Sequence, residues 1–114
     1  MEIVSFEALI RFSDEKMQKV PLFDSEKYFC DLYCLRPGQD QRVHAHAESD
    51  KIYVVVRGSG LFHVGGEERE LKSGQAVIAR PGQPSFMSSA QVKIFSALVC
   101  AIKPVWAQSC KPTI

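Results

Sequence analysis

Short runs of hydrophobic and β-branched residues, separated by glycine-containing turns, make up most of the chain after about residue 27. One such run, Ile52–Val56, stops just before Gly58. Short runs bounded by turn residues are typical of β-strands. The pattern predicts strands over Tyr28–Leu35, Arg42–His46, Ile52–Val56, Leu61–Val64, Glu68–Leu71, Ala76–Ala79 and Val92–Ile102. Strands with this spacing predict an all-β sandwich or barrel and exclude a doubly wound α/β fold.

The segment before residue 27 has a different pattern. Ala8, Leu9 and Phe12 have helical spacing, so Val4–Lys19 is the helical candidate. A chain of 114 residues suits a single domain. We expect a barrel core over about 27–103, an N-terminal arm over 1–26 and a C-terminal tail over 104–114.

The overall composition is that of an ordinary globular protein. Hydrophobic residues make up 46% of the chain and charged residues 24%, and the net charge is +1. The basic residues are scattered, so no stripe of positive charge indicates nucleic-acid binding. No apolar run approaches the roughly 20 residues of a membrane helix, and the N-terminus does not resemble a signal peptide. We therefore expect a cytoplasmic protein that binds neither nucleic acid nor membranes.

The four cysteines do not predict a disulfide framework. Cys30 and Cys34 lie in one predicted strand, where four residues span about 13 Å. That separation is too large for a disulfide between them. Cys100 lies in an apolar run and is predicted to be a core thiol, whereas Cys110 lies in the predicted tail.

Two of the three histidines form the sequence His44-Ala45-His46. In a strand these two side chains project from one face, about 6.6 Å apart along the chain, and can converge on one cation. The competing interpretation is a pair of surface histidines. His63 lies between Phe62 and Val64, so alternation predicts that it faces away from the core.

The spacing around this histidine pair resembles the first motif of the cupin family. Gly38 precedes His44 by five intervening residues, and the strand after His46 ends at Gly58. The second cupin motif, a glycine, a strand and a proline-containing turn, resembles Gly74–Ser85.

The resemblance covers about Leu35 to Val99. It implies a small single-domain cupin of the RmlC-like, cupin 2 type. The implied fold is the cupin double-stranded β-helix, a jelly-roll barrel, with a short N-terminal helical segment. Small cupins include metal-dependent dioxygenases, isomerases and decarboxylases as well as non-catalytic binding domains, so the fold does not select a function.

Two positions depart from the family pattern. Lys51 stands where the family has its ligand glutamate, and Ser85 stands where it has its third histidine. A protonated lysine has no lone pair to donate, and a serine hydroxyl is a poorer transition-metal ligand than imidazole. His44 and His46 are the only family metal ligands that carry over.

A one-residue shift in register would supply a third ligand. Asp50 would then face inward beside His44 and His46, forming the 2-His-1-carboxylate set of non-haem iron(II) sites. In this register the core-facing residues of the strand are Ile52, Val54 and Val56. In the family register they are Lys51, Tyr53 and Val55. The two registers exclude each other unless a bulge intervenes. We favour the register with Asp50 inside, because its inward face is the more apolar.

Three functional hypotheses follow. The first is a binding module with a degenerate pocket for a small polar or anionic molecule, with or without a weakly held divalent metal; its pocket candidates are Lys51, Tyr53 and Ser85. The second is an enzyme that uses iron, manganese, nickel or zinc at His44 and His46. The third is a structural dimer with an idle pocket. In each case we expect a homodimer, because pairing covers exposed strand edges.

Overall fold

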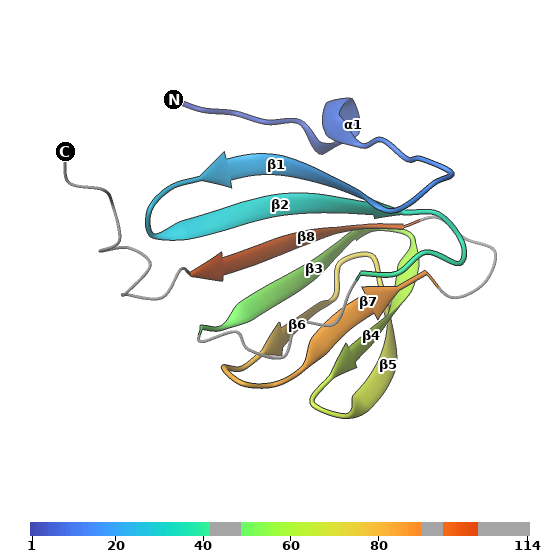
Figure 1. Cartoon of the computed structure of the whole chain (residues 1–114). Helices are drawn as coiled ribbons and strands as arrows, with labels where there is room; N and C mark the ends of the chain where they lie inside the picture. The colour runs from blue at the N-terminus through green and yellow to red at the C-terminus, as the bar shows by residue number, and fades with distance from the viewer. Residues whose placement is uncertain (42–48, 90–94, 103–114) are drawn as a thin grey trace.

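The computed structural model describes residues 1–41, 49–89 and 95–102. Within them the chain forms two antiparallel β-sheets and one short helix (Figure 1). The elements are α1 (Phe6–Leu9), β1 (Gln18–Asp24), β2 (Tyr28–Leu35), β3 (Lys51–Arg57), β4 (Ser59–Val64), β5 (Glu67–Lys72), β6 (Ala76–Ala79), β7 (Ser85–Ser88) and β8 (Phe95–Ile102). The predicted all-β jelly roll with a short N-terminal helical segment is confirmed.

The larger sheet has the strand order β1-β2-β8-β3-β6, and the smaller one has the order β5-β4-β7. The last strand of the chain, β8, therefore lies at the centre of the larger sheet, between β2 and β3 (Figure 1). Its two neighbours pair with it in antiparallel registers. These registers place residues from distant parts of the sequence in rows across the sheet.

Three turns share one hydrogen-bonding pattern. The sequences 36–39 and 80–83 both read Arg-Pro-Gly-Gln, and 72–75 reads Lys-Ser-Gly-Gln. In each turn the glutamine N–H donates to the carbonyl of the first residue, and the glutamine Oε1 accepts from the N–H of that residue at 2.8 Å. Gly38 and Gly82 have φ values of 84° and 82°, which a type II turn requires at this position. A hydrogen bond from the backbone to a glutamine side chain therefore stabilises each of these turns, which the sequence predicted.

The main core fills the space between the sheets. It contains buried side chains from both sheets, among them Phe62 of β4, Met87 of β7 and Phe95 of β8. The ring of Phe62 makes edge-to-face contacts with Tyr53 at 5.6 Å and with Phe95 at 6.1 Å between centroids. Such contacts are favoured geometries for buried aromatic rings.

The N-terminal segment covers part of the outer surface of the larger sheet. Its apolar residues Leu9, Ile10 and Phe12 pack against a second core of Val20, Leu32 and Cys34. Only Phe6–Leu9 is helical, so the helix is much shorter than the candidate Val4–Lys19, whose last residues belong to β1. The sheet therefore begins within the segment 1–26 that the sequence suggested as an arm. None of the helices in the described part of the chain is long and apolar enough to cross a membrane.

Candidate functional site

The side-chain pattern of β3 decides which residues line the barrel. Lys51, Tyr53 and Val55 are 8%, 0% and 1% exposed, whereas Ile52 is 41% exposed. The strand therefore adopts the register that the family resemblance implied, and the favoured register with Asp50, Ile52, Val54 and Val56 inside is wrong.

The apolar character of the Ile52 face misled the prediction because both faces of β3 contact apolar material. Val56, on the outer face, packs against the second core beneath the N-terminal segment. On the inner face, the cross-strand neighbours of Lys51 are Ala101 and Ala79. These small side chains leave room for the long side chain of Lys51.

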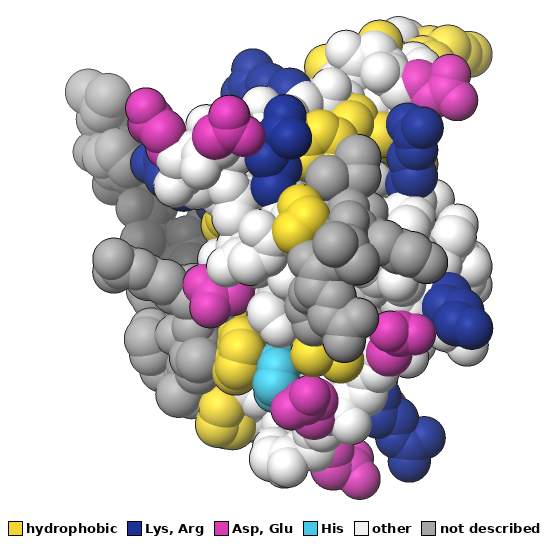
Figure 2. All heavy atoms as spheres, turned by 90° about the vertical axis from the view of Figure 1, so that its right-hand side faces the viewer, with side chains coloured by type: hydrophobic (Ala, Val, Ile, Leu, Met, Phe, Trp, Pro, Cys, Tyr) yellow, Lys and Arg dark blue, Asp and Glu magenta, His cyan; other side chains and the backbone are white. Residues whose placement is uncertain are grey.

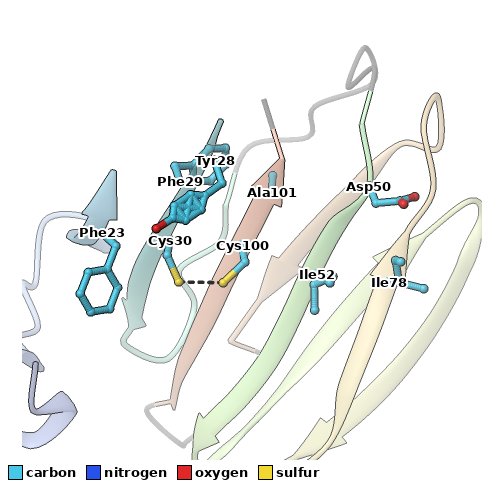
Figure 3. Close-up of a pocket in the computed structure, with 9 residues that line it drawn as sticks. All are labelled: Phe23, Tyr28, Phe29, Cys30, Asp50, Ile52, Ile78, Cys100 and Ala101. Atoms are coloured by element: carbon cyan, nitrogen blue, oxygen red, sulfur yellow. Dashed lines mark hydrogen bonds between the residues drawn. The ribbon is translucent and has the colours of Figure 1, made fainter. Parts of the chain in front are cut away.

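Asp50 lies on the opposite side of the sheet from the barrel interior (Figure 3). Its Oδ1 is 3.6 Å from Nη1 of Arg80, and both side chains are substantially exposed. The predicted ligand set of Asp50 with His44 and His46 has no support from this placement. His44 and His46 themselves lie outside the described residues.

Tyr53, Ser85 and Gln41 form a buried hydrogen-bonded group inside the barrel. The Tyr53 hydroxyl lies 3.0 Å from Ser85 Oγ and donates to Gln41 Oε1 at 3.4 Å. All three residues are at most 3% exposed. The Nε2 of Gln41 is buried and has no hydrogen-bond partner within the described residues. A buried donor of this kind is costly to leave unpaired, which makes Gln41 a candidate for contact with a ligand.

Lys51 extends over the ring of Tyr53, with Nζ 5.4 Å from the ring centroid. Its ammonium group makes no ion pair with any carboxylate in the described part of the chain. Burial lowers the pKa of Lys51, and the nearby charge of Lys19 lowers it further, against the opposing effect of Asp31. The cation–π contact offsets only part of the cost of burying this charge.

Asp31 and Lys19 belong to the same inner surface. The Asp31 carboxylate is 7% exposed and lies 3.6 Å from Nζ of Lys19, which is itself 54% exposed. Burial raises the pKa of Asp31, and Lys19 partly opposes that rise. With Lys51 nearby, the three groups carry one net positive charge when all are ionised.

An open cavity of about 560 Å³ lies beside these residues. Its lining includes Lys19, Tyr33, Asp40 and Gln41, together with residues 16–18 at the start of β1. Burial, with a contribution from the Asp31 charge, raises the pKa of Tyr33 to about 12. Tyr33 therefore carries a neutral hydroxyl at pH 7. Of the buried hydrogen-bonded group, Gln41 lines this cavity.

Two of the four usual cupin ligand positions, those of Lys51 and Ser85, lie within the described residues, and neither side chain suits a metal ion. Lys51 offers an ammonium where a carboxylate is needed, and the Ser85 hydroxyl is already hydrogen-bonded to Tyr53. No group of three or more His, Cys, Asp or Glu side chains with metal-site geometry occurs within residues 1–41, 49–89 and 95–102.

Sequence reasoning proposed Lys51, Tyr53 and Ser85 as pocket residues, and the structure brings these three together. It did not identify Gln41 or Asp31. The signal for Asp31 was present, since this aspartate interrupts the otherwise apolar and aromatic run of β2. No signal marked Gln41, because its partners come from distant strands.

His63 lies outside this site, as predicted. Its ring stacks on Phe86 with 4.0 Å between centroids, and Nδ1 is 3.5 Å from Glu68 Oε2. Figure 2 shows one face of the molecule, on which hydrophobic, acidic and histidine side chains lie side by side. His63 is a surface strand residue of the smaller sheet.

The barrel and its inward-facing site can be compared with known proteins. The family model described as "Cupin domain" matches residues 31–98. The chain belongs to the cupin family. No match was found among curated proteins.

Several solved structures share this fold. The TT1209 protein of Thermus thermophilus is 40% identical; the match covers 91% of this chain and 100% of that chain, with a TM-score of 0.86. An RmlC-like cupin protein from Desulfovibrio desulfuricans is 23% identical over 92% of this chain and 99% of that one, with a TM-score of 0.80. A predicted oxalate decarboxylase from Thermotoga maritima is 19% identical over 77% of this chain and 81% of that one, with a TM-score of 0.72. The last two likenesses support the fold alone.

Proposed function

We propose that this cupin is a binding module whose barrel holds a small anionic molecule, with an oxyanion group next to Lys51. The observation that carries this proposal is the buried Lys51 ammonium, which has no ion-pair partner within the described residues. Buried charges in proteins are normally paired. A carboxylate or a comparable anion would supply the missing partner.

The neighbouring groups are also suited to an oxyanion. Gln41 offers an unpaired N–H donor, and Tyr33 offers a neutral hydroxyl at pH 7. Asp31 already forms an ion pair with Lys19 at the rim, at 3.6 Å, so its negative charge has a partner other than Lys51. Anion oxygens form short, charge-assisted hydrogen bonds with such donors.

The space available favours a small molecule. The open cavity beside Tyr33 and Gln41 measures about 560 Å³, within the roughly 300–1,000 Å³ typical of small-molecule sites. Among the described residues, Lys16 and Lys19 line it along with one carboxylate, that of Asp40. The two lysines would attract an anion to this cavity.

Calorimetric titration with oxalate, malonate, succinate and inorganic phosphate, in the presence of a chelator, tests the proposal. Oxalate is included because a cupin of this fold is named a predicted oxalate decarboxylase. We expect saturable binding of at least one anion. The Lys51→Met variant should bind it about 10- to 100-fold more weakly, because a hydrogen bond to a charged group contributes about 1.5–3 kcal/mol.

Lys27→Met is the matched control, because Lys27 is exposed in the turn between β1 and β2. This variant removes the same charge outside the barrel and should bind the anion as the wild type does. Equal weakening in both variants, or no binding of any of the four anions, would refute the proposal.

The second candidate is an enzyme with a divalent iron, manganese, nickel or zinc ion at His44 and His46. The cupin-like spacing of this histidine pair favours it. Elemental analysis of protein purified without an affinity tag should then find near-stoichiometric metal, and His44→Ala/His46→Ala should lose it. Metal-free wild-type protein that shows no thermal shift with added divalent cations would exclude this candidate.

We also propose that the molecule is a homodimer paired through strand edges. In the larger sheet β1 and β6 are the outermost strands among those described, and an open edge is a template for pairing with a second chain. Light scattering at micromolar concentration should give twice the monomer mass of 12.8 kDa.

A further inference from the structure

The outer surface of the larger sheet carries two cysteines that face each other directly. Cys30 of β2 and Cys100 of β8 are register partners, and their Sγ atoms are 2.7 Å apart. In Figure 3 the two sulfurs point toward one another across the two strands. Both residues are half-buried free thiols. Cys100 therefore lies on the outer surface opposite Cys30, and not in the main core, where its apolar neighbours in the sequence predicted it.

The two cysteines lie in one row of outward-facing residues across all five strands. The registers connect Phe23, Cys30, Cys100, Ile52 and Ile78 in that order. These side chains line an open, mostly apolar pocket of about 320 Å³. Solvent and small reagents can therefore reach the sulfur pair from outside the barrel.

The backbone geometry suits a disulfide. Facing residues of an antiparallel pair have Cα atoms about 4.5–5.5 Å apart, within the roughly 4.4–6.8 Å that disulfides span. The sulfurs are already close enough that rotation of the two side chains suffices, with no change in strand pairing. Cys34 provides the contrast: it is fully buried on the same strand, and its partner across β8 is Ser96.

We propose that Cys30 and Cys100 form a reversible redox site, which a peroxide oxidises from a dithiol to a cross-strand disulfide. Burial, together with the adjacent Cys30 thiol, raises the pKa of Cys100 to about 12. Because the two sulfurs lie 2.7 Å apart, whichever reacts first is within reach of the other, which resolves it.

The reaction balances with one peroxide for each pair. One sulfur of the pair attacks an oxygen of hydrogen peroxide, the O–O bond breaks, and a sulfenic acid and one water form. The other sulfur then attacks the sulfenic sulfur, the S–O bond breaks, and a second water leaves with the proton of that second thiol. Two electrons pass from the two sulfurs to the peroxide. A dithiol reductant reverses the step by thiol–disulfide exchange.

The test uses the full chain with Cys110→Ser, which removes the cysteine outside the described residues and leaves three of the four. The protein is treated with a few equivalents of hydrogen peroxide, and its intact mass should then be lower by two hydrogen atoms. Alkylation of the treated protein counts the thiols that remain. One alkylatable thiol, Cys34, should remain, and peptide mapping should find Cys30 joined to Cys100. Dithiothreitol should restore all three thiols.

Matched variants separate this pair from ordinary thiol oxidation. Cys34→Ser should form the same disulfide, whereas Cys30→Ser and Cys100→Ser should form no intramolecular bond. The disulfide should raise the midpoint of thermal unfolding by at least about 5 °C, because it closes a long loop. If a serine variant fails to fold, peptide mapping of the protein that carries only Cys110→Ser still shows whether Cys30 and Cys100 are joined.

Three results would overturn the proposal: oxidation of Cys34 in preference to the pair, conversion to sulfinic acid without a crosslink, or disulfides that join two chains. A fourth result would overturn it as well: a protein mass that does not change under peroxide conditions strong enough to oxidise free dithiothreitol completely. None of these outcomes depends on what the barrel binds.

Discussion

The two ends of the barrel interior differ in chemistry although the same strands build both. At one end Leu35 of β2 faces Phe95 of β8, and both side chains are fully buried. At the other end Phe29 and Ala101 are in one row with Lys51, and Asp31 lies close to that row. One end is thus closely packed with apolar side chains, whereas the other contains charged groups, of which Lys51 has no ion-pair partner within the described residues.

Side-chain size accounts for part of this difference. Phe95 fills its end of the barrel so closely that Gly60 of β4 lies against its ring. At the polar end the neighbours of Lys51 are two alanines, Ala79 and Ala101. The two ends of the barrel interior therefore differ in the size of the side chains that fill them.

The largest effect is expected from Gly60→Ala at the packed end. A methyl group at this position would clash with the ring of Phe95. We expect a loss of about 1–3 kcal/mol in the free energy of unfolding, the usual cost of overpacking a core. Urea denaturation measures it. Phe95→Leu should recover part of the loss in the double variant; a change below about 0.5 kcal/mol in the single variant would show that this end is not closely packed.

Lys51→Met at the polar end should instead stabilise the ligand-free protein, by about 1–2 kcal/mol at pH 7, because it removes a buried charge without an ion-pair partner. The pKa of Lys51 in the folded protein is lower than its ordinary value of 10.5. Below the folded pKa both states are protonated and the penalty is complete. Between the two values only the unfolded state binds the proton, so the wild type gains stability as pH rises.

The advantage of the methionine variant should therefore shrink as pH approaches 10.5. Urea denaturation of both proteins at several pH values measures the difference. Lys27→Met serves as the control for removal of an exposed lysine charge. A pH-independent difference would mean that Lys51 is not buried as an ammonium.

Tyr53→Phe is expected to have a smaller effect, a loss of about 0.5–1.5 kcal/mol, typical of one buried hydrogen-bonding group. It removes the hydroxyl that joins Ser85 to Gln41 and leaves the ring packing on Phe62 intact. Ser85→Ala should cost a similar amount. The losses should not add in the double variant, because both changes break the same hydrogen bond. Additive losses would contradict a shared hydrogen bond.

The smallest effect should come from Asp50→Asn on the outer surface. The ion pair of Asp50 with Arg80 is exposed, and such pairs contribute less than about 1 kcal/mol. Unfolding should change by less than about 0.5 kcal/mol, and salt should remove what difference there is. Anion binding and metal content should match those of the wild type. A loss of anion binding or of metal would indicate that Asp50 faces the barrel interior.

Much of the fold could be predicted from the sequence. The short apolar runs and the glycine turns located the strands Tyr28–Leu35, Ala76–Ala79 and the strand ending at Ile102 closely. The strand β1 was missed because the polar and apolar residues of Gln18–Asp24 do not alternate regularly; the register shifts between Pro21 and Phe23. Irregularities of this kind are common in edge strands and hide the periodicity.

The candidate site could be predicted only in part. Lys51 and Ser85 stood out because they replace the metal ligands expected in a cupin, and both are in the barrel. The orientation of β3 could not be predicted from hydrophobicity. Ile52 and Val56 lie on its outer face, where Ile52 is exposed and Val56 is covered by the N-terminal segment, so this face is apolar although it is not the inner one. Periodicity predicts that two faces differ, and packing by other elements decides which of them is inside.

The sequence by itself determined the strands other than β1 and β7, the turns, and the residue types that a cupin pocket would contain. These features depend on local conformational preference and on alternation along one segment. The tertiary structure decided which face of β3 lines the barrel, that Gln41 joins Tyr53 and Ser85, and that Cys30 faces Cys100. Each of these depends on the register between strands far apart in the chain. Such registers depend on how the whole set of side chains packs, which no single segment encodes.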